Sequence, residues 1–144
     1  MSPCVVVDTN VLVSALRSRQ GASFKLLSLV GEGLFDIVLS VPLVVEYESA
    51  AKRHARQLGL SYQDIDDVID YLCHVGIARE IYFLWRPFLR DPGDDLVLEL
   101  AVESECDYLI THNISDFAGA DSFDVKVVTP QAFLRIIGQT DEHA

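Results

Sequence analysis

The chain has 144 residues, of which 50% are hydrophobic and 23% charged, a balance typical of one globular domain rather than of a disordered chain. It carries 11 basic and 22 acidic side chains, so its formal net charge is −11. That charge excludes a nucleic-acid binder that relies on overall positive charge. Any polyanion would have to be met by a local basic patch or by metal ions.

The cysteines and the apolar stretches indicate a soluble, cytoplasmic protein. The three cysteines, Cys4, Cys73 and Cys106, form no CxxC motif and are expected to be reduced thiols. No basic stretch precedes the first apolar residues, and Asp8 interrupts them, which argues against a signal peptide. The longest apolar stretch, Ile37 to Val45, is far shorter than the roughly 20 residues of a membrane helix, so no membrane association is expected.

The predicted elements alternate between strands and helices. Residues 4–7 form a β-branched apolar run, which is typical of a strand buried on both faces of a parallel sheet. Thr129 and Pro130 are typical of the N-cap and first turn of a closing helix. In chain order, we expect a strand at 4–7, helices at 11–17 and 23–30, a strand at 35–39, helices at 42–57 and 61–76, a strand at 79–84, a helix at 94–106, strands at 108–111 and 125–128, and a helix from 130 to about 137.

This alternation predicts one α/β/α domain with a mostly parallel sheet. We expect the domain to span residues 1–138 and to be followed by a polar tail at 139–144. In open sheets of this kind, ligands bind outside the carboxyl ends of the strands. The residues that follow the strands are therefore the candidates for a functional site.

Acidic side chains follow each of four predicted strands. Asp8 ends the first strand, and Glu46 lies in the first turns of the helix after the second. The polar residues after the third and fourth strands are Asp91, Asp94, Asp95, Asn113 and Asp116. If these side chains converge, their mutual repulsion must be neutralised. Carboxylate oxygens select Mg²⁺ or Mn²⁺, and such ions can polarise a phosphate and lower the pKa of a water molecule.

Each acid could instead have a structural role, because Asp and Glu commonly cap helices and interact favourably with helix N-termini. Spacing alone leaves the two interpretations balanced for Glu46 or Asp94 taken singly. Asp8 favours function, since a carboxylate at the end of a buried apolar strand is costly to bury unpaired. The adjacent pair of Asp94 and Asp95, with Asp91 before it, exceeds what one helix cap requires.

Four segments spread over most of the chain stand out in this order: Asp8-Thr9-Asn10-Val11-Leu12, Glu46-Tyr47-Glu48, Arg90-Asp91-Pro92-Gly93-Asp94-Asp95 with Leu98-Glu99-Leu100-Ala101, and Asp107-Tyr108-Leu109-Ile110-Thr111-His112-Asn113-Ile114-Ser115-Asp116-Phe117. Their order, strand context and spacing resemble the PIN-domain nucleases. Within that family, the chain is most similar to the VapC-like toxins of bacterial and archaeal toxin–antitoxin modules.

The resemblance implies a five-stranded parallel sheet and a Mg²⁺- or Mn²⁺-dependent endoribonuclease that hydrolyses RNA phosphodiester bonds. The acids that it makes both catalytic and metal-binding are Asp8, Glu46, Asp95 and Asp116. In this assignment, Asp95 is preferred to Asp94 because of its spacing to the apolar positions that follow. The residues expected to orient these ligands, without binding the metal themselves, are Thr9, Asn10, Asp91, Asp94, Thr111 and Asn113. Some relatives carry an acid where this chain has Asn113, so the choice between one and two metal ions stays open.

Basic residues after the first helix and along the Glu46 helix form a candidate rim for RNA phosphates. They are Arg17, Arg19, Lys25 and Lys52. Basic residues near helix C-termini also complement the helix dipole, so the two roles compete. The resemblance further implies a homodimer and a cognate antitoxin protein that blocks the acidic groove.

Other functions remain as alternatives. A non-catalytic RNA-binding or interaction module could retain the PIN fold without the chemistry. A receiver-like phospho-acceptor also combines a small α/β domain with acids and Mg²⁺, but it needs adjacent acids after its first strand, where Asp8 stands alone. A serine hydrolase is disfavoured because no GxSxG motif occurs, and a P-loop enzyme because no GxxxxGK[ST] motif occurs.

Overall fold

The computed structural model describes residues 2–81 and 88–139. Within them, five parallel strands form one sheet in the order β3-β2-β1-β4-β5. The strands are β1 (Cys4–Val7), β2 (Asp36–Leu39), β3 (Ile77–Ala78), β4 (Tyr108–Ile110) and β5 (Lys126–Val128). The helices are α1 (Thr9–Arg17), α2 (Ala22–Ser28), α3 (Val41–Arg53), α4 (Ala55–Leu58), α5 (Tyr62–Val75), α6 (Pro92–Glu103) and α7 (Pro130–Ile136), with short 3₁₀ turns η1 (Ile114–Phe117) and η2 (Ala120–Phe123).

β1 is the central strand of the sheet. It pairs Val5 with Ile37 of β2 and Val6 with Leu109 of β4. Val5 and Val6 are both 0% exposed, because helices cover both faces of the sheet at this point. The run of valines without alternation is therefore explained by burial on two faces, and the predicted parallel sheet is confirmed.

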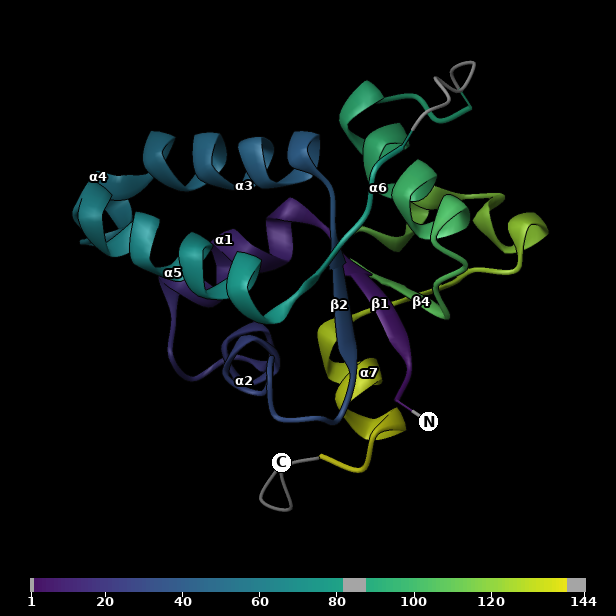
Figure 1. Cartoon of the computed structure of the whole chain (residues 1–144), viewed down its shortest axis with the longest axis horizontal. Helices are drawn as coiled ribbons and strands as arrows, with labels where there is room; N and C mark the ends of the chain where they lie inside the picture. Colours follow the sequence, from purple (N-terminus) through teal and green to yellow (C-terminus); the bar gives the residue numbers. More distant parts are fainter. Residues whose placement is uncertain (1, 82–87, 140–144) are drawn as a thin grey trace.

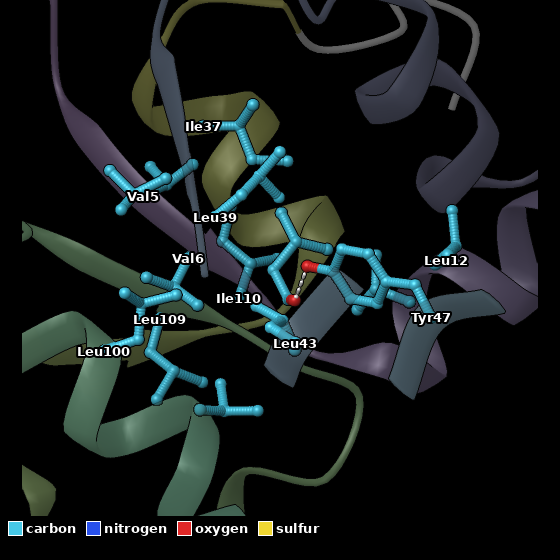
Figure 2. Packing of buried hydrophobic residues seen from close by; sticks show 14 of the residues in the cluster. Val5, Val6, Leu12, Ile37, Leu39, Leu43, Tyr47, Leu100, Leu109 and Ile110 are labelled. Carbon is cyan, nitrogen blue, oxygen red and sulfur yellow. Dashed lines mark hydrogen bonds between the residues drawn. The ribbon is translucent and has the colours of Figure 1, made fainter. Parts of the chain in front are cut away.

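Helices form a layer on each side of the sheet. Figure 1 shows α1, α3 and α5 on one side of β1 and β2, and α6 on the other side. α1 packs against α3 and α3 against α5, whereas α6 packs against β1, β2 and β4. Figure 2 shows the buried apolar side chains of strands and helices that fill the space between the layers. The predicted three-layer α/β/α architecture is confirmed.

Side-chain caps fix where several helices start at the carboxyl ends of strands. The Ser40 hydroxyl accepts a hydrogen bond from the Leu43 N–H at the start of α3 (3.3 Å). The Thr129 hydroxyl accepts one from the Ala132 N–H at the start of α7 (3.1 Å), as its position before Pro130 predicts. Among the described residues, no helix has the length and apolar character needed to cross a membrane.

The structure differs from the sequence-based expectations at the sheet edge and along the third helix. The third strand, expected at 79–84, is the two-residue β3, which pairs directly with β2 after Gly76 ends α5. Residues 79–81 are not in a strand, and residues 82–84 lie outside the described residues. The helix expected at 42–57 breaks at His54 into α3 and α4, with the His54 Nδ1 atom 2.9 Å from the Ala50 carbonyl oxygen.

The strand order reverses direction at β1. The chain passes from β1 to β2 and β3 on one side, and then returns to place β4 on the other side of β1. The connection after β1 therefore leads towards β2, and the connection after β4 leads towards β5, so the two leave the sheet edge in opposite directions. Ligands in doubly wound folds bind at such a point, outside the carboxyl ends of the strands. Asp8 follows β1 and Thr111 follows β4 at this position.

Candidate active site

Asp8 is a buried carboxylate held by hydrogen bonds at the end of β1. It is 7% exposed, and its backbone N–H donates to the Ile110 carbonyl oxygen of β4 (2.9 Å). Its Oδ1 atom accepts from the Thr9 N–H at the start of α1 (2.8 Å), and its Oδ2 atom accepts from the Thr111 hydroxyl (2.8 Å). The carboxylate orientation is thus set from two sides, by α1 and by the residue that follows β4.

Thr111 is the centre of a small polar network that joins β1, α1 and the segment after β4. It is 0% exposed, and besides donating to Asp8 its hydroxyl oxygen accepts from the Asn113 N–H (3.0 Å). The Asn10 side chain spans the same gap, because its Nδ2 donates to Thr111 Oγ1 (3.4 Å) and its Oδ1 accepts from the His112 N–H (3.3 Å). Asn10 takes part in this network through its side chain and Asn113 through its backbone N–H, and the role expected for them beside a metal stays a prediction.

The acids of α6 have three different surroundings. Asp91 is the N-cap, and its Oδ1 accepts from the Gly93 N–H (2.8 Å). Asp95 Oδ1 accepts from the backbone N–H groups of Leu89 (2.8 Å) and Phe88 (3.3 Å). Asp94 makes no such bond within the described residues, and it lines an open cleft of about 910 Å³ together with Asp91 and Asp116.

Electrostatic repulsion shows that several of these carboxylates lie near one another. Burial raises the pKa of Asp8, and the charges of Asp116 and Asp91 raise it further, against the hydrogen bonds from Thr111 and Thr9, which lower it. Burial, followed by the charges of Asp8, Asp91, Asp116 and Asp95, raises the pKa of Asp94 to about 6. Asp8, Asp94 and Asp116 therefore form one electrostatic group, delivered by β1, α6 and η1.

A donor set of carboxylate oxygens that repel one another suits a hard divalent cation, which would remove the repulsion. Within residues 2–81 and 88–139, however, no three His, Cys, Asp or Glu side chains lie close enough to enclose a metal ion. Glu46 is half-buried on α3, and it makes no hydrogen bond or ion pair in that part of the chain. The residues fit a metal by charge and chemistry, but they do not form a closed cage.

Comparison with known proteins agrees with this architecture. A family model described as "PIN domain" matches residues 4–115, which is more than half of the chain. The chain belongs to the PIN-domain family. The structure is also similar to the crystal structure of VapBC2 from Rickettsia felis bound to a DNA fragment from its promoter, with a TM-score of 0.60 at 13% identity, over 88% of this chain and 98% of that one. No curated protein matches the sequence.

The basic residues predicted to bind RNA phosphates do not cluster beside the acidic side chains of this PIN domain. Arg17 lies in the last turn of α1, about 12 Å along the helix axis from Thr9 by the rise of 1.5 Å per residue. Arg19 is exposed beyond that helix, and Lys25 lies on α2. Lys52 is engaged by two acids of its own domain, with its Nζ 2.9 Å from Asp66 and 3.5 Å from Glu48.

Two features of the site differ from the sequence-based expectations or go beyond them. The first is that Asp94 rather than Asp95 lines the cleft, although the spacing to the apolar positions favoured Asp95. The second is Ser23 at the start of α2, which is 2% exposed and lies with its Oγ 2.7 Å from His112 Nε2. This contact ties α2 to the segment after β4. It joins residues 89 positions apart, and no local pattern indicates it.

Proposed function

We propose that this PIN domain is a Mg²⁺- or Mn²⁺-dependent endoribonuclease and the toxin of a toxin–antitoxin module. The observation that carries the proposal is Asp8, a carboxylate buried at the carboxyl end of the central strand and repelled by Asp116 and Asp91. The hydrogen bonds from Thr9 and Thr111 hold this carboxylate but do not outweigh its burial and the repulsion, which oppose its ionisation. A bound cation would provide that compensation, in the crevice where ligands of this fold class bind.

The residues that would hold the metal are Asp8, Asp94 and Asp116, with Glu46 from α3 as the fourth acid. Asp94 replaces Asp95 in this proposal because Asp95 already accepts two backbone N–H groups, whereas Asp94 feels the charges of Asp8 and Asp116. Thr9, Asn10, Thr111 and Asn113 would orient these ligands, and Asp91 caps the helix that carries Asp94.

When bound, the metal would polarise the scissile phosphate and make a water molecule more acidic. Thr111 and the Thr9 N–H hold Asp8 in a fixed orientation, so that no reorganisation is needed during the reaction. Asp94 lines the cleft and makes no hydrogen bond within the described residues, so its carboxylate could accept the proton of the attacking water. The water oxygen would bond to phosphorus and the bond to the 3′ oxygen would break, leaving a 5′-phosphate and a 3′-hydroxyl.

The partners proposed for this chain are RNA as substrate, a cognate antitoxin protein and a second copy of the chain in a homodimer, all in the cytoplasm. The similar Rickettsia felis structure is of VapBC2 bound to a DNA fragment, which supports an antitoxin partner by analogy of fold alone. The open acidic cleft could hold either a segment of the antitoxin or an RNA strand.

A non-catalytic RNA-binding or interaction module is the second candidate function. One observation favours it: no three potential ligand side chains in the described part of the chain enclose an ion site. A module of this kind would bind its partner without cutting RNA. The experiment below separates the two functions.

The proposal predicts that Asp8→Asn abolishes cleavage but leaves the fold intact. Even residues that only orient a metal ligand change affinity or activity about 10- to 100-fold, so we expect a loss greater than roughly 100-fold. The fold should tolerate asparagine, because the raised pKa of Asp8 shows that a neutral group is favoured there. The measurement is sequencing of the RNA ends that the purified protein generates with Mn²⁺ and with EDTA.

Three matched substitutions complete this experiment. Asp94→Asn should reduce cleavage as strongly as Asp8→Asn, and Asp95→Asn should reduce it less. Asp70→Asn removes an exposed acid of α5 and should leave cleavage unchanged. Metal-independent cutting, or equal activity of wild type and Asp8→Asn, would refute the proposed nuclease. Metal binding without cutting would favour the non-catalytic module.

A further inference from the structure

Tyr47 has an unusual position in the core. It is 1% exposed and is one of the largest fully buried side chains of the domain. Its hydroxyl donates a hydrogen bond to the Val7 carbonyl oxygen, the dashed contact in Figure 2. Burial raises the pKa of Tyr47, and the charge of Asp8 raises it further, so the hydroxyl stays protonated and remains a donor.

The bond is made where β1 no longer pairs with β2. Successive residues of a strand direct their N–H and C=O groups to opposite sides. The Asp8 N–H is directed to β4, so the Val7 carbonyl is directed to the side of β2. The last pair between β1 and β2 is Val5 with Ile37, two residues before Val7. Tyr47 therefore supplies a partner for a buried carbonyl near the end of the β1–β2 ladder.

The two residues in this bond are sequence neighbours of two of the acids. Val7 immediately precedes Asp8, and Tyr47 immediately follows Glu46. β1 and α3 are otherwise separate elements, and the bonded residues are 40 positions apart. One hydrogen bond thus joins the backbone next to Asp8 to the helix turn that carries Glu46. Since adjacent residues of a helix are about 100° apart, Tyr47 can enter the core while Glu46 stays half-buried at its border.

We propose that Tyr47 is a positioning residue whose hydroxyl, through the Val7 carbonyl, fixes the turn of α3 that carries Glu46 relative to Asp8, so that both carboxylates could contact one ion. This inference rests on the proposed function, because it assumes that Glu46 and Asp8 share an ion. It explains how a carboxylate with no hydrogen bond of its own among the described residues is kept in place. The tyrosine ring fills the core, and its hydroxyl sets the spacing between two elements of the site.

A purely structural role would give a different result from positioning. If Tyr47 only fills space and satisfies a carbonyl, Tyr47→Phe lowers stability but leaves the affinity for metal unchanged. If it positions Glu46, the same substitution weakens metal binding, and only when Glu46 is present to be positioned. A double-mutant cycle between the two residues distinguishes these outcomes.

The experiment is a titration of the full chain with Mn²⁺ alone, with free Mn²⁺ followed by electron paramagnetic resonance. We expect Tyr47→Phe to raise the Kd for Mn²⁺ about 10-fold, the lower end for residues that orient a ligand. In the Glu46→Gln background, Tyr47→Phe should produce no further rise. Partial unfolding would lower the number of sites rather than the affinity of the folded fraction, so it cannot mimic this pattern.

Tyr71→Phe is the matched control. The Tyr71 hydroxyl donates to the Val30 carbonyl oxygen (2.8 Å), a contact of the same type over 41 positions, between α5 and the end of α2. It should leave the Mn²⁺ affinity unchanged. An equal Kd for wild type and Tyr47→Phe, or an undiminished effect in the Glu46→Gln background, would overturn the inference alone. Mn²⁺ binding that is absent from wild type, or unaffected by Asp8→Asn, would overturn the proposed function and the inference with it.

Discussion

Asp94 is the residue whose ionisation depends most clearly on its neighbours in the site. Burial and the charges of Asp8, Asp91 and Asp116 raise its pKa from 3.8 to about 6. The proton is therefore held more tightly by the folded chain than by the unfolded chain. A group of this kind contributes stability below its unfolded pKa, and that contribution is lost as the pH rises through its folded pKa.

We predict that the stability of the metal-free protein depends on pH through Asp94. In EDTA at about pH 3, below the unfolded pKa of 3.8, wild type and Asp94→Asn should have similar Tm values, because Asp94 is largely protonated in both the folded and the unfolded chain. At pH 7.5, Asp94→Asn should have the higher Tm, since asparagine removes the repulsion that the ionised acid experiences. Thermal unfolding at the two pH values measures the difference.

Mn²⁺ should reverse this order at pH 7.5, because an ion bound only by the folded state stabilises wild type. Asp70→Asn, which removes an exposed acid of α5, controls for the change in net charge. The same Tm difference between wild type and Asp94→Asn at both pH values would contradict the assignment of Asp94 to the acidic group.

At the level of single residues, the sequence predicts which side chains are near the site but not how each is used. Asp8 and Thr111 follow apolar strands, so their place at the carboxyl edge is a local property. The roles of Asp94 and Asp95 are decided by contacts with other segments, such as the Leu89 N–H that occupies Asp95. The Tyr47 hydroxyl bond to β1 likewise depends on how α3 packs, which no motif encodes.

Several helices of this domain begin at side-chain caps, which also fix where the preceding loops end. α5 starts with a capping box, in which the Ser61 hydroxyl accepts from the Asp64 N–H (3.0 Å) and Asp64 Oδ2 accepts from the Ser61 N–H (2.9 Å). Hydrogen bonding of the Ser61 N–H and of the Ser61 side chain to the Asp64 carboxylate lowers the pKa of Asp64, since it favours the charged form. α5 buries Ile65, Ile69 and Leu72, so its start determines how this face meets the core.

We predict that Ser61→Ala destabilises the domain by about 1 kcal/mol, the usual loss for a helix N-cap. For a chain of this length, that corresponds to a decrease in Tm of roughly 2–8 °C. Urea unfolding followed by circular dichroism measures the change. Ser49→Ala lies at an exposed position within α3 and should be neutral or slightly stabilising, because alanine has the higher helix propensity. Equal effects of the two substitutions would show that the cap contributes nothing.

Elements were predictable where their determinants are local. The valines of β1 and the Thr129-Pro130 start of α7 lead directly to the observed structure. β3 was placed too late in the chain, because its two residues are defined by pairing with Val38 and Leu39 of β2 rather than by their own pattern. The break at His54 has no glycine or proline to mark it, and it coincides with a histidine ring beside the Ala50 carbonyl.

The whole molecule has a formal charge of −11 and an acidic cleft, so RNA is repelled by most of its surface. Basic side chains cannot all compensate, since Lys52 is already paired with Asp66 and Glu48. Arg17 and Arg19 remain as candidates for contacts to phosphates at some distance from the cleft. An RNA strand that reaches both the acidic cleft and the end of α1 would be bound through divalent cations in the cleft and through the two arginines at the helix end.

We predict that binding of a short RNA to wild type requires a divalent cation and that the two arginines contribute to its salt dependence. Ca²⁺ in place of Mg²⁺, with the RNA checked for integrity on a gel, should allow binding that EDTA abolishes. Arg17→Ala with Arg19→Ala should weaken binding and reduce the slope of log K against log salt by about 2, because each arginine would neutralise one phosphate. Arg135→Ala, at an exposed position of α7, should leave the slope unchanged. An unaltered slope in the double variant would mean that RNA does not reach the end of α1, and the path of the strand would then be confined to the cleft between α6 and η1.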